Sequence, residues 1–166
     1  MTAVFWILLL LLSNASRLAE AQSISGSTLN YDGESFATDV VAALTDGSTT
    51  TVSFTNCIFA KSLTINVPAT RTAAFPALIL SNCQFTSIAP VAVAFSVAAR
   101  TTNIAVGDIK MSGLTSVAAL QLSINGNALT TFGNVIVEQC SNCQGTVAVR
   151  NVILRNSMSL VLQRLT

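Results

Sequence analysis

The sequence lacks histidine altogether and carries few charged residues. Of its 166 residues only 9% are charged, and eight Lys and Arg against seven Asp and Glu give a formal net charge of +1. Without imidazole, a Ser-His-Asp or Cys-His catalytic centre and a zinc site built on histidine are excluded. A net charge of +1 without a basic cluster also excludes a typical nucleic-acid-binding surface. Because 51% of the residues are hydrophobic, the chain is too apolar to be intrinsically disordered.

An apolar run long enough to cross a membrane is also missing. Residues 4–12 (VFWILLLLL) are apolar, but a spanning helix needs about 20 such residues. A run of this length, followed by the small residues Ala19 and Ala21, is typical of a secretory signal peptide; a buried N-terminal helix or strand is the alternative. We therefore expect residues 1–21 to be a signal peptide, the mature chain to have no membrane span, and its destination to be the cell surface or the extracellular space.

The middle of the chain contains an internal repeat. Residues 52–59 (VSFTNCIF) align with residues 78–85 (LILSNCQF) at an offset of 26. The same offset leads to residues 104–111 (IAVGDIKM), and residues 135–140 (VIVEQC) repeat the pattern after a longer gap. Apolar residues alternate at period two in each unit, which is the signal of a strand. A second short alternating run follows each Asn position, so each repeat contains at least two strands.

Strand repeats of about 20 to 26 residues with a polar corner predict an all-β fold, namely a short right-handed parallel β-helix. In such a solenoid, equivalent side chains of successive coils stack in columns about 4.8 Å apart. An antiparallel sandwich with a coincidental repeat is the alternative. The alignment predicts a polar ladder (Asn56, Asn82, Asp108), an apolar stack (Phe59, Phe85, Met111) and a third column (Cys57, Cys83, Ile109).

Residues 35–44 (SFATDVVAAL) predict a short amphipathic helix before the first repeat. Phe36, Val40 and Leu44 recur at helical spacing, and Ser35 can cap the start of the helix. Because the first coil of a solenoid exposes strand edges, we expect residues 22–50 to form an N-terminal cap.

The repeats then occupy residues 51–166. They finish in the middle of a strand pattern with little charge, so we expect the solenoid to be incomplete at the C-terminus and open to end-to-end self-association.

Four cysteines, Cys57, Cys83, Cys140 and Cys143, are candidates for disulfides in a secreted chain. Cys57 and Cys83 are predicted at the same place in adjacent coils, where a disulfide can form, although buried free thiols fit equally well. The C-x-x-C spacing of Cys140 and Cys143 also occurs in redox and zinc motifs. Here it lacks the helix start of the former and would need ligands from other coils for the latter. We expect no metal and no cofactor.

Carboxylates are a second candidate chemistry, because glycoside cleavage usually requires two of them. Asp108 and Glu138 lie outside the acidic N-terminal region, but no acidic pair recurs at the repeat spacing and no basic cluster accompanies them. We therefore expect no enzyme, and keep a polysaccharide lyase or hydrolase as the alternative.

The repeat segments resemble the dispersed gene family surface proteins of trypanosomes. The resemblance rests on residues 52–59, 68–77 (PATRTAAFPA), 78–86 and 35–44. It implies a large secretory-route protein with β-helix repeats, membrane-spanning helices near its C-terminus, and a role in host-cell attachment; it brings no catalytic residues.

This chain lacks those C-terminal helices, so we expect an N-terminal or truncated copy. The expected function is a non-enzymatic secreted or surface module that contacts host surface or matrix proteins or glycans. A truncated copy without independent function is the alternative.

Overall fold

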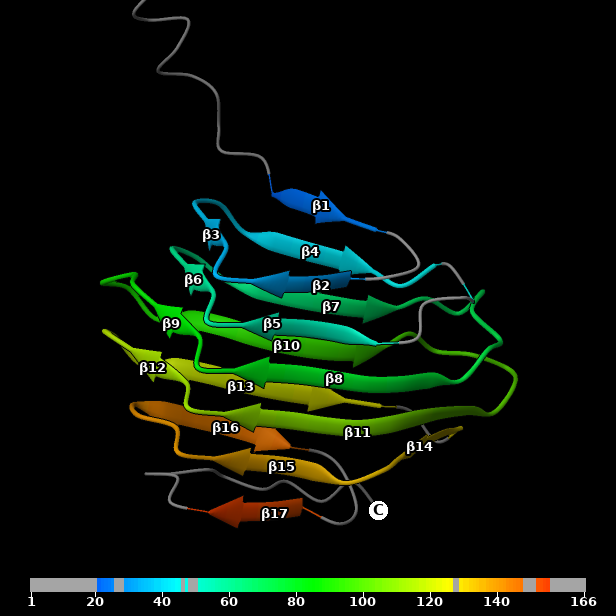
Figure 1. The fold of residues 1–166 in the computed structure, drawn as a ribbon. Helices are drawn as coiled ribbons and strands as arrows, with labels where there is room; N and C mark the ends of the chain where they lie inside the picture. Colours follow the sequence, from blue (N-terminus) through cyan, green and yellow to red (C-terminus); the bar gives the residue numbers. More distant parts are fainter. Residues whose placement is uncertain are drawn as a thin grey trace, which may run out of the picture.

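The chain folds into a parallel β-solenoid, in which successive coils stack along one axis (Figure 1). The computed structural model describes residues 21–25, 29–45, 47, 51–126, 129–147 and 152–155. These residues form only strands, turns and irregular segments, and every strand pairing among them is parallel. The predicted all-β parallel β-helix is confirmed, and the antiparallel sandwich is excluded.

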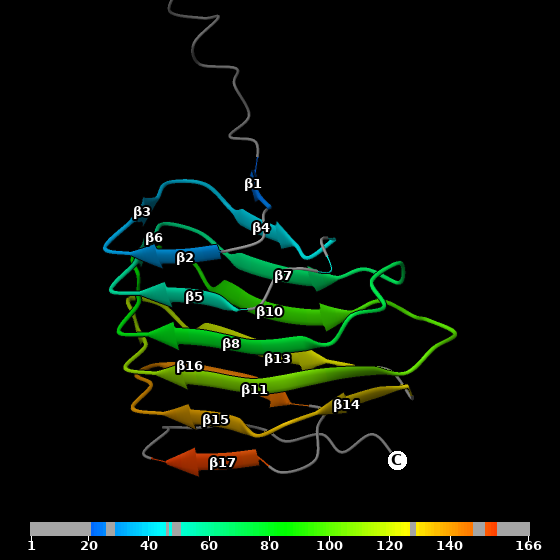
Figure 2. The ribbon, with the colours of Figure 1, turned by 45° about the vertical axis from the view of Figure 1, so that its right-hand side comes forward.

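Three sheets run along the solenoid, and Figure 2 shows the strands of sheet B stacked beneath one another. Sheet A contains β1 (Gln22–Ile24), β4 (Val40–Ala43), β7 (Leu63–Val67), β10 (Val91–Val97), β13 (Leu120–Asn125) and β16 (Cys143–Val147). Sheet B contains β2 (Leu29–Asp32), β5 (Val52–Thr55), β8 (Phe75–Ser81), β11 (Ile104–Ser112), β15 (Val135–Glu138) and β17 (Val152–Arg155), and β14 (Thr130–Phe132) also pairs with β11. Sheet C contains β3 (Ser35–Phe36), β6 (Ile58–Phe59), β9 (Gln84–Phe85) and β12 (Thr115–Ser116). The first four coils, from β2–β3–β4 to β11–β12–β13, contribute one strand to each sheet.

The core lies between the sheets and is built from the inward residues of each strand. In β10, for example, Val91, Val93, Phe95 and Val97 are buried and the residues between them are not. Because the pairing is parallel and in register, inward residues of one coil contact inward residues of the next, as Val93 faces Leu63 and Leu122 in sheet A. The period-two pattern of the sequence therefore becomes a continuous apolar column.

The predicted helix over residues 35–44 is wrong. The segment forms β3 and β4 of the first coil, in which Ser35 pairs with Ile58 and Val40 pairs with Leu63. Two short strands joined by three residues place Phe36, Val40 and Leu44 inward at a spacing that also fits a helix. As strands, β3 and β4 form backbone hydrogen bonds with β6 and β7 of the second coil. A helix over these residues would leave the edges of β6 and β7 unpaired.

The repeat alignment is right between the second and third coils and wrong for the fourth. Val52 pairs with Leu78, as predicted, but Leu78 pairs with Ile109 rather than with Ile104. The third coil is longer because Phe85 and Val93 are eight positions apart, whereas Phe59 and Leu63 are four apart.

The two halves of strand β11 each have alternating buried residues, and the sequence alignment matched the wrong half to β8. Ile104 and Val106 are buried in its first half, and Ile109 and Met111 are buried in its second half. The alternation of buried and unburied residues along the strand therefore shifts by one position at Gly107 and Asp108. Both halves offer an apolar-x-apolar pattern, so the sequence alone matched the first one.

Several predictions about the ends fall outside the described residues. The segment proposed as a signal peptide is described only at Ala21, and the last eleven residues, 156–166, are not described. No helix in the described part of the chain is both long enough and apolar enough to cross a membrane.

Candidate functional site

The polar corner between sheets B and C is defined by a backbone conformation. Asn56 and Asn82 follow β5 and β8 directly, and each has a φ of 53°. Glycine and asparagine adopt this left-handed conformation most readily. At the same corner, Gly33, Gly113 and Gln139 have φ values of 72°, 64° and 54° in the first, fourth and fifth coils. Asn56 and Asn82 therefore stand at equivalent corners, and the corner residues of the five coils share a backbone requirement.

The side chains at this corner do not form a simple amide ladder. Asn56 Nδ2 donates to Asp32 Oδ1 at 3.0 Å, which ties the second coil to the first. Asn82 sits beside Gly113, where an added Cβ would lie 2.4 Å from Asn82 Oδ1. In the described part of the chain no hydrogen bond joins the amides of Asn56 and Asn82.

Asp108 is not part of this corner, which corrects the predicted ladder. It lies inside β11 opposite Ala77, and its Oδ1 accepts a hydrogen bond from the backbone N–H of Asn134 at 2.8 Å. The five-residue difference between the predicted offset of 26 and the observed offset of 31 moves the corner of the fourth coil to Gly113.

The apolar stack also needs a correction in the fourth coil. Phe59 stacks on Phe36 at 4.9 Å and on Phe85 at 5.1 Å between ring centroids. Met111, predicted as the next member, is opposite Leu80 in sheet B instead. The place after Phe85 belongs to Ser116, which pairs with it in sheet C.

The four cysteines are buried free thiols: Cys57, Cys83 and Cys140 follow the left-handed corner residues of their coils, and Cys143 begins β16 in sheet A. Cys57 and Cys83 occupy equivalent places in adjacent coils, between the pairs Thr55–Ser81 and Ile58–Gln84. Leu114, rather than Ile109, continues this column, because the backbone N–H of Thr115 bonds to the Cys83 carbonyl.

Burial is the main cause of the shifted pKa values of Cys57 and Cys83. It raises the pKa of Cys57, and it raises the pKa of Cys83 to about 11. The neighbouring Cys143 lowers the pKa of Cys140, while Cys140 and burial raise the pKa of Cys143. The two thiols donate to the Glu138 and Ser141 carbonyls, at 3.8 Å and 3.6 Å. The disulfides predicted for these residues remain a prediction.

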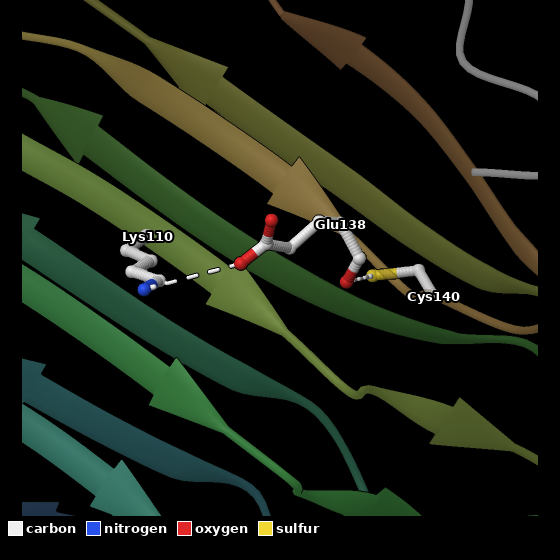
Figure 3. A network of polar contacts seen from close by, with 3 residues as sticks. All are labelled: Lys110, Glu138 and Cys140. Carbon is white, nitrogen blue, oxygen red and sulfur yellow. Dashed lines mark hydrogen bonds and ion pairs between the residues drawn. The ribbon is translucent and has the colours of Figure 1, made fainter. Parts of the chain in front are cut away.

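The carboxylates proposed as an enzymatic pair lie apart on the outside of sheet B. Asp108 is level with Asn134, four residues before Glu138 on the neighbouring strand, which is about 13 Å along a strand. Paired carboxylates of glycosidases are about 5–9.5 Å apart. Glu138 instead lies 3.9 Å from Lys110 Nζ, with its carbonyl near the Cys140 thiol (Figure 3).

The outside of sheet A has a different character. It presents small, uncharged side chains on neighbouring strands, and we call this surface the sheet A outer face. Ser96 Oγ donates to Asn66 Oδ1 at 2.7 Å, and Asn125 Nδ2 donates to Ser123 Oγ at 2.8 Å. Its members are partly or fully exposed: Thr64, Asn66, Ala92, Ala94, Ser96, Gln121, Ser123 and Asn125.

A buried arginine was not singled out in the sequence. Arg71 is only 2% exposed, and it donates from Nε to the Ala73 carbonyl and from Nη2 to the Ala74 carbonyl. Its guanidinium lies 5.7 Å from the Phe75 ring centroid. These contacts tie down the connection between β7 and β8, and no local sequence pattern distinguishes this arginine from an exposed one.

Within the described ranges, no three His, Cys, Asp or Glu residues are grouped so that they could hold an ion.

Comparisons with protein-family models, with curated proteins and with solved structures give no significant match. The resemblance to the trypanosome surface proteins is therefore a proposal that rests on residues 35–44, 52–59, 68–77 and 78–86.

Proposed function

We propose that this chain is a non-enzymatic secreted or surface module, a right-handed parallel β-helix that binds host surface or matrix proteins or glycans. The observation that carries the proposal is the uncharged sheet A outer face. Repeated Ser, Thr, Asn and Gln side chains offer donors and acceptors in rows about 4.8 Å apart. Neutral glycans and polar protein surfaces can make many weak hydrogen bonds to such rows without the desolvation cost of a buried charge.

The proposed export and family membership rest on segments of the sequence. The apolar segment at residues 4–12 supports export, and the segments 52–59 and 78–86 support membership of the dispersed gene family. A role in attachment follows from that resemblance.

Two serines provide a matched test of the binding face. Ser96 on sheet A donates to Asn66 at 2.7 Å, and Ser53 on sheet B donates to Asn30 at 3.1 Å, so both link neighbouring coils from the outside. Binding to a glycan array and to immobilised matrix proteins should weaken at least tenfold in Ser96→Lys and should change little in Ser53→Lys. Equal loss in both variants, or binding no stronger than that of an inert β-helix, would contradict the proposal.

The absence of enzymatic activity is tested separately. Polysaccharide cleavage that is present in the natural chain and abolished by Asp108→Asn or Glu138→Gln would establish the lyase or hydrolase alternative. A chain that neither binds nor cleaves would support a truncated copy without independent function. Sedimentation of residues 22–166 measures the proposed end-to-end self-association.

A further inference from the structure

Asn125 is the only asparagine in the sequence that is followed by glycine. It is the last residue of β13, and its exposed side chain belongs to the sheet A outer face, where Nδ2 donates to Ser123 Oγ at 2.8 Å. Asparagine is a thermolabile residue, and it reacts most readily before glycine, because no side chain shields the backbone nitrogen that follows. The Asn125 amide is therefore open to attack by its own backbone.

The attacking group is the backbone nitrogen of Gly126, which lies just beyond the end of β13. In the described part of the chain, no group accepts a hydrogen bond from the Gly126 N–H. Backbone outside a strand also moves at a lower free energy than backbone inside a sheet. The Gly126 nitrogen can therefore approach Asn125 Cγ without losing a backbone hydrogen bond.

Packing requires a glycine at position 126. A Cβ there would lie 2.5 Å from Phe132 Cε2 and 3.2 Å from Thr130 Cβ. Phe132 packs against the core, with its ring centroid 6.2 Å from that of Phe95. A larger residue at position 126 would displace this ring, so the fold retains the residue that leaves Asn125 most reactive.

Two exposed asparagines of the fifth coil are better protected. Asn134 is followed by Val135, which is β-branched, fully buried and part of β15. Asn142 is followed by Cys143, which begins β16 and is 1% exposed. In both cases a side chain crowds the following nitrogen, and the strand restricts its movement. Exposure alone therefore does not distinguish Asn125, but its successor does.

We propose that Asn125 and Gly126 form a site of spontaneous deamidation, which places a carboxylate on the sheet A outer face as the protein ages. The Gly126 nitrogen gives up its proton and attacks Asn125 Cγ. The Cγ–Nδ2 bond breaks, and ammonia leaves with that proton. Water then opens the resulting succinimide ring at either carbonyl, which leaves aspartate or isoaspartate.

The new carboxylate should weaken binding at the sheet A outer face, and this consequence, unlike the reaction, rests on the proposed function. An ordinary aspartate side chain is ionised at neutral pH. Asn125 is the partner of Ser96 in sheet A, so the charge would lie within the rows of polar side chains. A neutral ligand that covers this charge would have to remove its water.

Mass spectrometry of the aged protein tests the reaction without any ligand. The full-length reduced chain is incubated at neutral and at mildly alkaline pH, checked for folding by circular dichroism, and digested with trypsin at intervals. Peptide 111–150 contains Asn125, Asn134 and Asn142, and fragmentation assigns each conversion of amide to acid. Asn125 should be converted first, to both aspartate and isoaspartate. Its conversion should be faster at the higher pH, because the attacking nitrogen must lose its proton.

Asn125→Gln is the matched control, because glutamine keeps a neutral amide but has to close a larger ring. It should retain its amide over the same period. Three results would overturn the proposal: an intact Asn125 in the folded protein, conversion of Asn134 or Asn142 at the same rate or earlier, or equal conversion at position 125 in Asn125→Gln.

Asn125→Asp tests the consequence separately. This variant should bind the glycan array and the matrix proteins more weakly than the natural chain. Unchanged binding would contradict the effect of the carboxylate on the sheet A outer face. Absence of binding by both chains would contradict the proposed function, and the mass spectra would still decide whether Asn125 is a deamidation site.

Discussion

The Asn82 side chain occupies the space that a side chain on Gly113 would need. A Cβ on Gly113 would lie 2.4 Å from Asn82 Oδ1 and 3.4 Å from Asn82 Cα. Gly113 also has a φ of 64°, at the same corner of the solenoid as Asn82 in the coil before it. Glycine is therefore required here both by the backbone conformation and by the neighbouring coil.

Substitution of Gly113 should separate these two requirements when it is compared with Gly33. Gly33 has a φ of 72°, but nothing lies within 4 Å of its added Cβ. Gly33→Ala should lower the free energy of unfolding by about 1–2 kcal/mol, which is the cost of a left-handed alanine. Gly113→Ala should lower it by about 2–4 kcal/mol, because crowding against Asn82 is added. Urea denaturation measures both values.

Two further variants serve as controls for that comparison. Gly33→Asn should cost less than Gly33→Ala, since asparagine tolerates the left-handed region and stands at this corner in the next two coils. Asn82→Ala should reduce the penalty of Gly113→Ala. Equal losses for Gly33→Ala and Gly113→Ala would show that crowding contributes nothing.

Phe59 should be the most sensitive member of the aromatic stack. Its ring stacks on Phe36 and on Phe85, whereas Phe85 stacks only on Phe59 among the described rings. Phe59→Ala should cost about 3–5 kcal/mol of stability. Phe59→Leu should cost about 0.5–1.5 kcal/mol more than Phe85→Leu, because Phe59 also loses its ring contacts with Phe36 and Phe54. Thermal and urea unfolding measure the stability of both leucine variants. Equal losses of stability in Phe59→Leu and Phe85→Leu would show that the additional ring contacts of Phe59 contribute nothing.

Ser116 stands where the aromatic stack would continue after Phe85, and its buried hydroxyl should lower the stability of the fold. It is 8% exposed, and its hydroxyl is buried without a hydrogen-bond partner in the described residues. Ser116→Ala should raise the free energy of unfolding by about 1 kcal/mol, because the desolvation penalty disappears. Ser62→Ala is the opposite case, since Ser62 Oγ accepts from the Ala92 N–H at 3.0 Å. Ser62→Ala should lower the free energy of unfolding by about 1 kcal/mol, because this hydrogen bond is lost. A lower stability of both Ser62→Ala and Ser116→Ala would show that the Ser116 hydroxyl is not a source of instability.

Alkaline pH should destabilise the fold through Cys83. The pKa of this thiol is raised by burial from 9.0 to about 11, so the unfolded chain loses the proton first as the pH rises. The contribution of Cys83 is complete below pH 9 and is lost between pH 9 and pH 11, a change of about 2–3 kcal/mol. Urea unfolding under reducing conditions at intervals across this range measures it.

The matched control for this prediction is Cys83→Ala. The variant is expected to be less stable at neutral pH because it leaves a small cavity, but its stability should decline less steeply above pH 9. Parallel pH profiles for the natural chain and Cys83→Ala would rule out Cys83 as the cause.

The strand content and the stacking of the second and third coils could be predicted from local patterns. In those coils the alternation of Val52, Phe54, Leu78 and Leu80 is uninterrupted, and the Asn-Cys corner recurs at one spacing. Both signals are local, because side chains alternate along a strand and only a few residues tolerate the left-handed corner.

The sequence by itself determined which residues alternate and which corners need asparagine or glycine. Only the tertiary structure decided which apolar pair in β11 continues the core, since Ile104 with Val106 and Ile109 with Met111 satisfy the same local pattern. The choice depends on pairing with β8, whose register is shifted by five residues: four lie in the longer connection between Phe85 and Val93, and one lies between Val93 and Ile109. Likewise, residues 35–44 fit a helix locally, and parallel pairing with the second coil made them strands. Backbone pairing and burial are shared between coils, so they override a pattern that any single segment can satisfy alone.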